Sequence, residues 1–173
     1  EYGGLGLGVL EAALIQQAIG RQVAPASFTS AYAMAVIGLR DAASEAQKTD
    51  WLGRIASGTA ILGVGLTEAV GAREGAGVTL KGTQASGRAS FVMGAELATH
   101  FMLTTGHDLL ILERHATGVK ETALTTIDKS RHVVMLDLEN VECEVLSGDA
   151  MAAQGRMIDV GRVLLAADSL GAA

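Results

Sequence analysis

The sequence predicts an α+β protein: a helical block, an antiparallel, barrel-like β domain and then a further helix. Three observations predict it. Apolar residues recur at helical spacing through the first sixty residues, short runs of Val, Leu, Phe and Thr alternate with glycines after Gly58, and helical spacing returns near Gly161. We therefore expect three regions, over residues 1–60, 61–148 and 149–173.

The helical block contains three predicted helices. Their segments run over residues 9–19, from 27 or 29 to 39, and from 41 or 44 to 58. Gly20 is a plausible helix stop and Pro25 breaks the pattern, so the first two helices are separate. The second is apolar nearly all round, which predicts that it is buried.

Seven short strands are expected in the middle region. They lie near residues 61–66, 78–83, 87–92, 99–104, 108–113, 133–138 and 143–146. Strands gathered between helical segments favour an antiparallel arrangement over alternating βαβ units. The last segment, 161–173, has the spacing of an amphipathic helix, and we expect the natural protein to continue beyond both ends of the sequence.

Composition excludes several classes of function. A net charge of −6 and scattered Lys and Arg residues argue against a nucleic-acid partner. A single cysteine, Cys143, permits no intrachain disulfide and fits a reducing, cytoplasm-like compartment. The apolar stretches are shorter than the roughly 20 residues that cross a bilayer, so no membrane span is expected.

Three features are candidates for chemistry, each with a plainer alternative. The glycine-rich segment after Leu66 offers backbone amides to a ligand or forms a surface hairpin. Phe91, one of three phenylalanines, contacts a planar ligand or belongs to the core. The four histidines lack the spacing of a metal site, so we expect no metal. They are His100, His107, His115 and His132.

Taken in order, short motifs over essentially all 173 residues resemble the acyl-CoA dehydrogenase family. EYGGLGLG and the following LEAALIQQAIGR resemble its glycine loop and helix, and residues 45–58 resemble the segment that closes its helical domain. Matches to its flavin-binding and later motifs follow. They are Leu66-Thr67-Glu68, residues 87–92, Gly118-Val119, residues 127–131 with 133–141, and residues 161–167.

The resemblance implies an FAD-dependent acyl-CoA dehydrogenase subunit of fatty acid (lipid) degradation, which desaturates an acyl-CoA thioester between its α and β carbons. Residues 1–60 would end the N-terminal helical domain, 61–148 would form the middle β domain, and 149–173 would start a C-terminal four-helix bundle. It implies flavin contacts from five residues and a substrate contact from one. They are Leu66, Thr67, Phe91, Val92 and Met93, and Arg73.

The family's catalytic glutamate would lie beyond Ala173, so no residue here is assigned as catalytic base. The implied partners are an acyl-CoA, electron-transfer flavoprotein or a similar acceptor, and further subunits of a homo- or hetero-tetramer.

Departures from the family's motifs leave other functions open. Ala69 replaces a proline, Arg73 and Glu74 replace Ser and Asp, and Met93 replaces a threonine whose hydroxyl contacts the flavin. A thioether is a weak acceptor and donates no hydrogen bond. One alternative is therefore a non-catalytic partner subunit of a heteromeric acyl-CoA dehydrogenase; others are an acyl-CoA oxidase or a flavin monooxygenase of the same fold.

Overall fold

A computed structural model describes residues 2–66 and 75–173 of the chain. Thr67 and Arg73, two of the predicted site residues, lie outside the described residues. The helices are α1 (Val9–Arg21), the π-helix η1 (Thr29–Met34), α2 (Ala35–Ala42), α3 (Glu45–Ala56) and α4 (Ala150–Ala172). The strands are β1 (Leu62–Gly65), β2 (Gly77–Lys81), β3 (Gln84–Met93), β4 (His100–Thr104), β5 (Leu109–Glu113), β6 (Val119–Ala123), β7 (Val133–Glu142) and β8 (Glu144–Val145).

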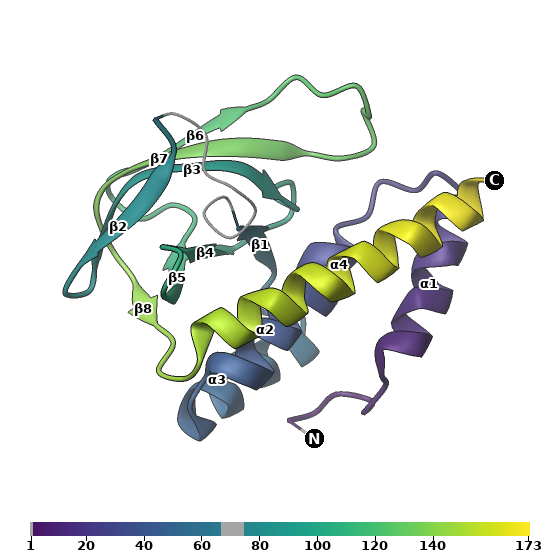
Figure 1. The fold of residues 1–173 in the computed structure, drawn as a ribbon, viewed down its shortest axis with the longest axis horizontal. Coiled ribbons are helices and arrows are strands. Elements are labelled where there is room, and N and C mark those ends of the chain that lie inside the picture. Colours follow the sequence, from purple (N-terminus) through teal and green to yellow (C-terminus); the bar gives the residue numbers. More distant parts are fainter. Residues whose placement is uncertain (1, 67–74) are drawn as a thin grey trace.

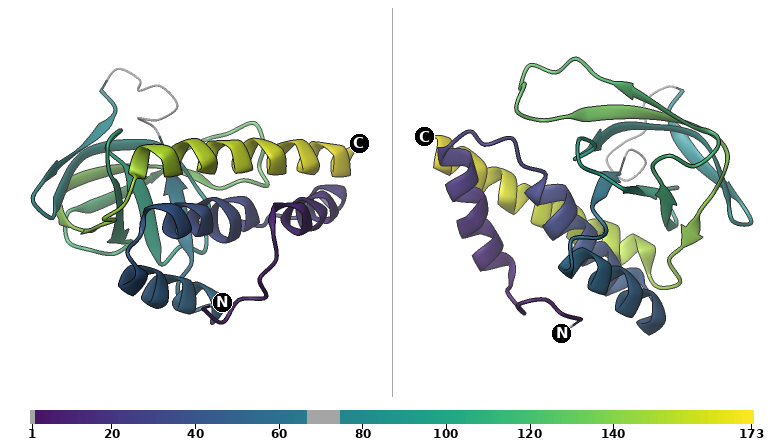
Figure 2. Two further views of the ribbon diagram at one scale, coloured as in Figure 1. Left: turned by 60° about the horizontal axis from the view of Figure 1, so that its bottom comes forward. Right: turned by 180° about the vertical axis from the view of Figure 1, so that it is seen from behind.

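The strands form one curved sheet, and the helices gather at one side of it (Figure 1). The long helix α4 packs along α1, η1 and α2, so that the first and last helices lie side by side while the two termini are apart (Figure 2). This arrangement confirms the predicted α+β class. No helix in the described part of the chain combines the length and apolar character that crossing a membrane requires.

The sheet has the strand order β6-β7-β3-β1-β4-β5-β8, with β2 also paired to β3. All pairs are antiparallel except β1 with β4, which is parallel, so the sheet is mostly antiparallel, in agreement with the predicted layout apart from this pair. The parallel pair follows from the topology. β4 reverses direction after β3 but lies on the far side of β1, which is itself antiparallel to β3.

Two clusters of buried side chains stabilise the fold. One lies between the helices and the sheet and includes Leu39, Trp51 and Met157, and the other lies within the curve of the sheet around Phe101. Complete burial of each large apolar side chain contributes about 1.5–3 kcal/mol. η1 and α2 supply many buried residues, which confirms that the second predicted helix is buried.

The observed elements differ from the expected ones at three places. β6 was not predicted, because its sequence VKETA is exposed along almost its whole length and lacks apolar alternation. α4 begins at Ala150, well before residue 161, with Asp149 accepting a hydrogen bond from the Ala152 amide. The second predicted helix begins as a π-helix, a geometry that apolar spacing does not distinguish from the α-helix.

Candidate cofactor and ligand cleft

A cleft of about 670 Å³ opens between the sheet and the helices. Its walls come from four regions that are distant in sequence: the segment leading into η1, the ends of β1 and β3, the loop between β6 and β7, and the second half of α4. Apolar side chains and polar or charged groups both line the cleft, a combination that small-molecule sites use for burial and for orientation of the ligand.

An irregularity in β3 presents an aromatic ring to the cleft. The pairing of β3 with β7 shifts register between Ala89 and Val92, and Phe91 within this bulge has a φ of 57°, in the left-handed region. This conformation costs a non-glycine residue about 1–2 kcal/mol, and such strain is concentrated at functional sites. The Phe91 side chain is 48% exposed, so the alternative that it belongs to the core is wrong.

The structure brings three of the six predicted site residues to this cleft. Leu66, Phe91 and Met93 all line it, and Met93 is 37% exposed. The Val92 side chain is fully buried in the core of the sheet, so only its main chain is available for a ligand. The flavin-binding roles assigned to these residues stay predictions.

Residues 26–30, which we call the strap, form the helical side of the cleft together with α4. Three side chains from different elements hold the strap: the Ser27 hydroxyl donates to Glu96, the Thr29 hydroxyl donates to Gln16 Oε1 at 3.0 Å, and Arg131 donates to the Ala26 carbonyl at 3.1 Å. The sequence indicated Ser27 and Thr29 only as possible helix caps, and nothing in its local pattern pointed to Glu96 or Gln16.

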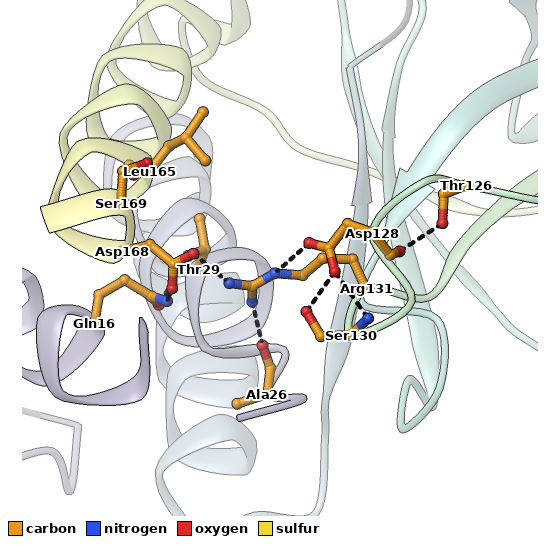
Figure 3. A network of polar contacts seen from close by, with 10 residues as sticks. All are labelled: Gln16, Ala26, Thr29, Thr126, Asp128, Ser130, Arg131, Leu165, Asp168 and Ser169. Carbon is orange, nitrogen blue, oxygen red and sulfur yellow. Dashed lines mark hydrogen bonds and ion pairs between the residues drawn. The ribbon is translucent and has the colours of Figure 1, made fainter. Parts of the chain in front are cut away.

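Asp168 of α4 joins these contacts into one network (Figure 3). Gln16, whose side chain is fully buried, donates to Asp168 Oδ1 at 2.6 Å, and Arg131 donates to Oδ2 at 2.8 Å. Arg131 also forms an ion pair at 3.8 Å with Asp128. Hydrogen bonds from the hydroxyl and amide of Ser130 lower the pKa of Asp128. The network thus connects α1, α4 and the β6–β7 loop, and it fixes the spacing of the cleft walls.

The remaining candidates lie in different surroundings. His132 lines the cleft, whereas His100 packs against Trp51 of α3 with ring centroids 4.9 Å apart. Within residues 2–66 and 75–173, no three His, Cys, Asp or Glu side chains are grouped as a metal site requires. Burial raises the pKa of the Cys143 thiol to about 11, and this thiol donates to the Thr83 carbonyl.

The described residues combine a helical block, a mostly antiparallel curved sheet and a long closing helix around the cleft. Residues 1–59 match the family model of the acyl-CoA dehydrogenase N-terminal domain. No curated protein matches the chain.

Solved structures show the same fold. A variant of the Tcur3481-Tcur3483 steroid ACAD is 26% identical with a TM-score of 0.82. The match covers 98% of this chain and 48% of that chain. The ChsE4-ChsE5 complex from Mycobacterium tuberculosis is 23% identical with a TM-score of 0.81, at 98% and 48% coverage. An acyl-CoA dehydrogenase complexed with FAD from Bacillus anthracis is 19% identical with a TM-score of 0.82, at 98% and 32% coverage.

These findings show that the chain has the fold of the N-terminal and middle parts of acyl-CoA dehydrogenases, with a family match over residues 1–59. The chain spans about half the length of the first two structures and a third of the third.

Proposed function

We propose that this chain is part of an FAD-dependent acyl-CoA dehydrogenase subunit that desaturates an acyl-CoA thioester between its α and β carbons. One observation carries the proposal: Phe91 is held in a strained conformation that exposes its ring in a cleft shared with Leu66 and Met93. A strained, half-exposed aromatic residue contributes little to the core, so its placement favours a ligand with a flat ring. FAD in a structure of similar fold supports the same assignment.

The cleft fits a flavin ring in size and lining. Phe91 would pack on one face of the ring, while the main chains of Leu66, Val92 and Met93 would supply hydrogen bonds to its edge. Thr67 and Arg73, outside the described residues, are proposed as a hydroxyl contact to the ring and as a contact to a substrate phosphate. Bound FAD supplies the hydride acceptor. The protein groups orient the ring and stabilise the charge that develops on it.

No residue of this chain is assigned as the base that removes the α proton. We also propose the division into residues 1–60, 61–148 and 149–173 as the end of a helical domain, a β domain and the start of a C-terminal helical domain. An electron-transfer flavoprotein as acceptor and a homo- or hetero-tetrameric assembly complete the proposal. The similarity to a chain of the ChsE4-ChsE5 complex supports a heteromer.

Met93 favours a second candidate function. Its thioether lies at the cleft where a hydroxyl would donate a hydrogen bond to the flavin, and it cannot replace that bond. A subunit that has lost flavin contacts and serves assembly alone would show this change. We therefore propose the non-catalytic partner subunit as the alternative.

Spectroscopy of the purified protein distinguishes the two. An active subunit is expected to bind FAD, show a bound-flavin absorption spectrum and lose its visible absorbance when an acyl-CoA is added without oxygen. Butyryl-CoA, octanoyl-CoA and a CoA thioester of a steroid side chain are suitable substrates. A colourless protein that takes up no FAD contradicts the dehydrogenase proposal and supports the partner subunit. Rapid reoxidation by oxygen would indicate an oxidase or a monooxygenase instead.

A further inference from the structure

One wall of the cleft, formed by strap residues and by the loop between β3 and β4, carries hydrogen-bond acceptors whose own protons already take part in hydrogen bonds. Ser27 donates its hydroxyl proton to Glu96, Thr29 donates to Gln16, and Ser30 donates to the Ser27 carbonyl at 3.1 Å. Each hydroxyl oxygen has two lone pairs, and an ionised carboxylate only accepts. We call Ser27, Thr29, Ser30 and Glu96 the acceptor wall; all four line the cleft.

Glu96 contributes a carboxylate oxygen that lacks a hydrogen-bond donor within residues 2–66 and 75–173. Its Oε1 accepts from Ser27, but its Oε2 is buried and has no hydrogen-bond partner among the residues that the structure describes. A buried acceptor without a donor is costly, and native structures rarely keep one that nothing satisfies. The carboxylates of Asp128 and Asp168 lie on the same cleft, but both are paired with Arg131, so Glu96 is the carboxylate whose second oxygen still lacks a donor in the described part of the chain.

We infer that the acyl group bound in this cleft carries a hydrogen-bond donor, most simply a hydroxyl, that contacts Glu96 and the hydroxyl oxygens of the acceptor wall. The inference rests on the proposed function, because that function assigns an acyl-CoA to the cleft. The flavin ring is assigned to Phe91 and Met93 on the sheet side, which leaves the strap side for the acyl group. A plain acyl chain would leave the acceptor wall without a donor, and an ionised carboxylate on the chain has no proton to donate to it.

Equilibrium binding to the FAD-loaded protein tests the inference without requiring turnover. The ligands are octanoyl-CoA, the same thioester with a hydroxyl at its terminal carbon or at mid-chain, and the counterpart with a terminal carboxylate. We expect a hydroxylated thioester to bind about tenfold to a hundredfold more tightly than octanoyl-CoA, because its hydroxyl donates to a charged group. The carboxylate is expected to show no such gain, because it has no proton to donate.

The variant Glu96→Gln replaces one acceptor oxygen by an amide that donates. It is expected to remove most of the hydroxyl preference, measured as the ratio of the two dissociation constants. Glu139→Gln is the matched control, because Glu139 is an exposed carboxylate on β7 outside this cleft. That variant is expected to leave the ratio unchanged. Circular dichroism of both variants establishes that they are folded.

The possible outcomes separate this inference from the proposed function. Hydroxyl preference without flavin reduction supports the inference and contradicts the dehydrogenase activity. Flavin reduction with equal binding of plain and hydroxylated thioesters overturns the inference alone. The hydroxyl-bearing chain of FAD is another source of donors. If Glu96→Gln binds FAD more weakly but keeps the ratio of the dissociation constants of the plain and hydroxylated thioesters, the acceptor wall binds the FAD chain. That result would overturn the inference for the acyl group.

Discussion

Phe91 combines a strained backbone with a side chain exposed in the cleft. Its left-handed backbone at the β3 bulge costs stability, and its exposed ring recovers little of that cost by burial in the protein itself. Under the proposed function, a ligand packed on the exposed ring would add to the contacts that hold this conformation. Stability and ligand binding can therefore be tested separately at this position.

Two variants at position 91 separate the backbone from the ring. Phe91→Gly and Phe91→Ala both remove the ring, so both are expected to weaken FAD binding to a similar extent. Glycine adopts a positive φ without penalty, so Phe91→Gly is expected to be more stable than Phe91→Ala by about 1 kcal/mol. Urea unfolding measures the difference. Greater stability of the alanine variant would contradict the reported backbone conformation.

His100 connects the stability of the contact between α3 and β4 to pH. Burial and the nearby Arg54, whose Nη2 lies 3.4 Å from His100 Nε2, lower the pKa of His100 below its usual 6.5; Glu113 opposes this effect. The unfolded chain therefore takes up the proton first as pH falls. The stabilising contribution of the neutral ring is complete above pH 6.5 and is lost as the pH falls toward the folded-state pKa.

Unfolding curves followed by fluorescence test this, because Trp51 is the single tryptophan of the chain and packs edge-to-face with His100. The free energy of unfolding is expected to decrease from pH 7 to pH 5. In His100→Gln this part of the pH dependence should disappear, while the other three histidines are unaltered. An identical pH profile in the variant would show that His100 is not responsible.

At the scale of elements, α1 and α4 cross with their backbones in close contact. A Cβ atom at Gly20 would lie 2.2 Å from the Asp168 carbonyl oxygen, and one at Gly171 would lie 2.0 Å from that of Gln17. Only glycine permits this close approach of the two backbones. The same crossing brings Gln16 of α1 to Asp168 of α4, and hence holds the network that links both helices to the β6–β7 loop.

Gly20→Ala is therefore expected to destabilise the protein by about 1–3 kcal/mol, because the helices must separate. The matched control is Gly53→Ala in α3, where nothing lies within 4 Å of the added methyl group. Since alanine has the higher helix propensity, this second substitution is expected to stabilise by about 0.5–1 kcal/mol. Thermal unfolding measures both changes. Equal effects at the two positions would contradict the close crossing.

At the scale of the whole molecule, the sequence predicts elements better than their assembly. Periodicity identified α1 and α3 and seven of the strands, because each carries a local pattern of apolar residues. The apolar pattern does not predict β6, because this strand is exposed. Nor does it predict the parallel pairing of β1 with β4, because that pairing depends on strand order. Local patterns carry no information on which strands become neighbours.

The cleft shows the same limit. Leu66, Phe91 and Met93 were predicted through short motifs that resemble those of a family, and the structure brings them together. Gln16 and Glu96 were missed, because their roles arise from contacts with residues far away in the sequence, such as Asp168 and Ser27. Side-chain networks of this kind require the fold to be known first.

The central claim is that the sheet side of the cleft holds a flavin ring. A crystal structure of the purified protein with FAD tests it most directly. The account predicts the isoalloxazine ring in van der Waals contact with the Phe91 ring, about 4 Å away, with its edge at the main chain of Val92 and Met93. A flavin bound elsewhere, or a Phe91 ring that turns away from the cleft in that structure, would contradict the account.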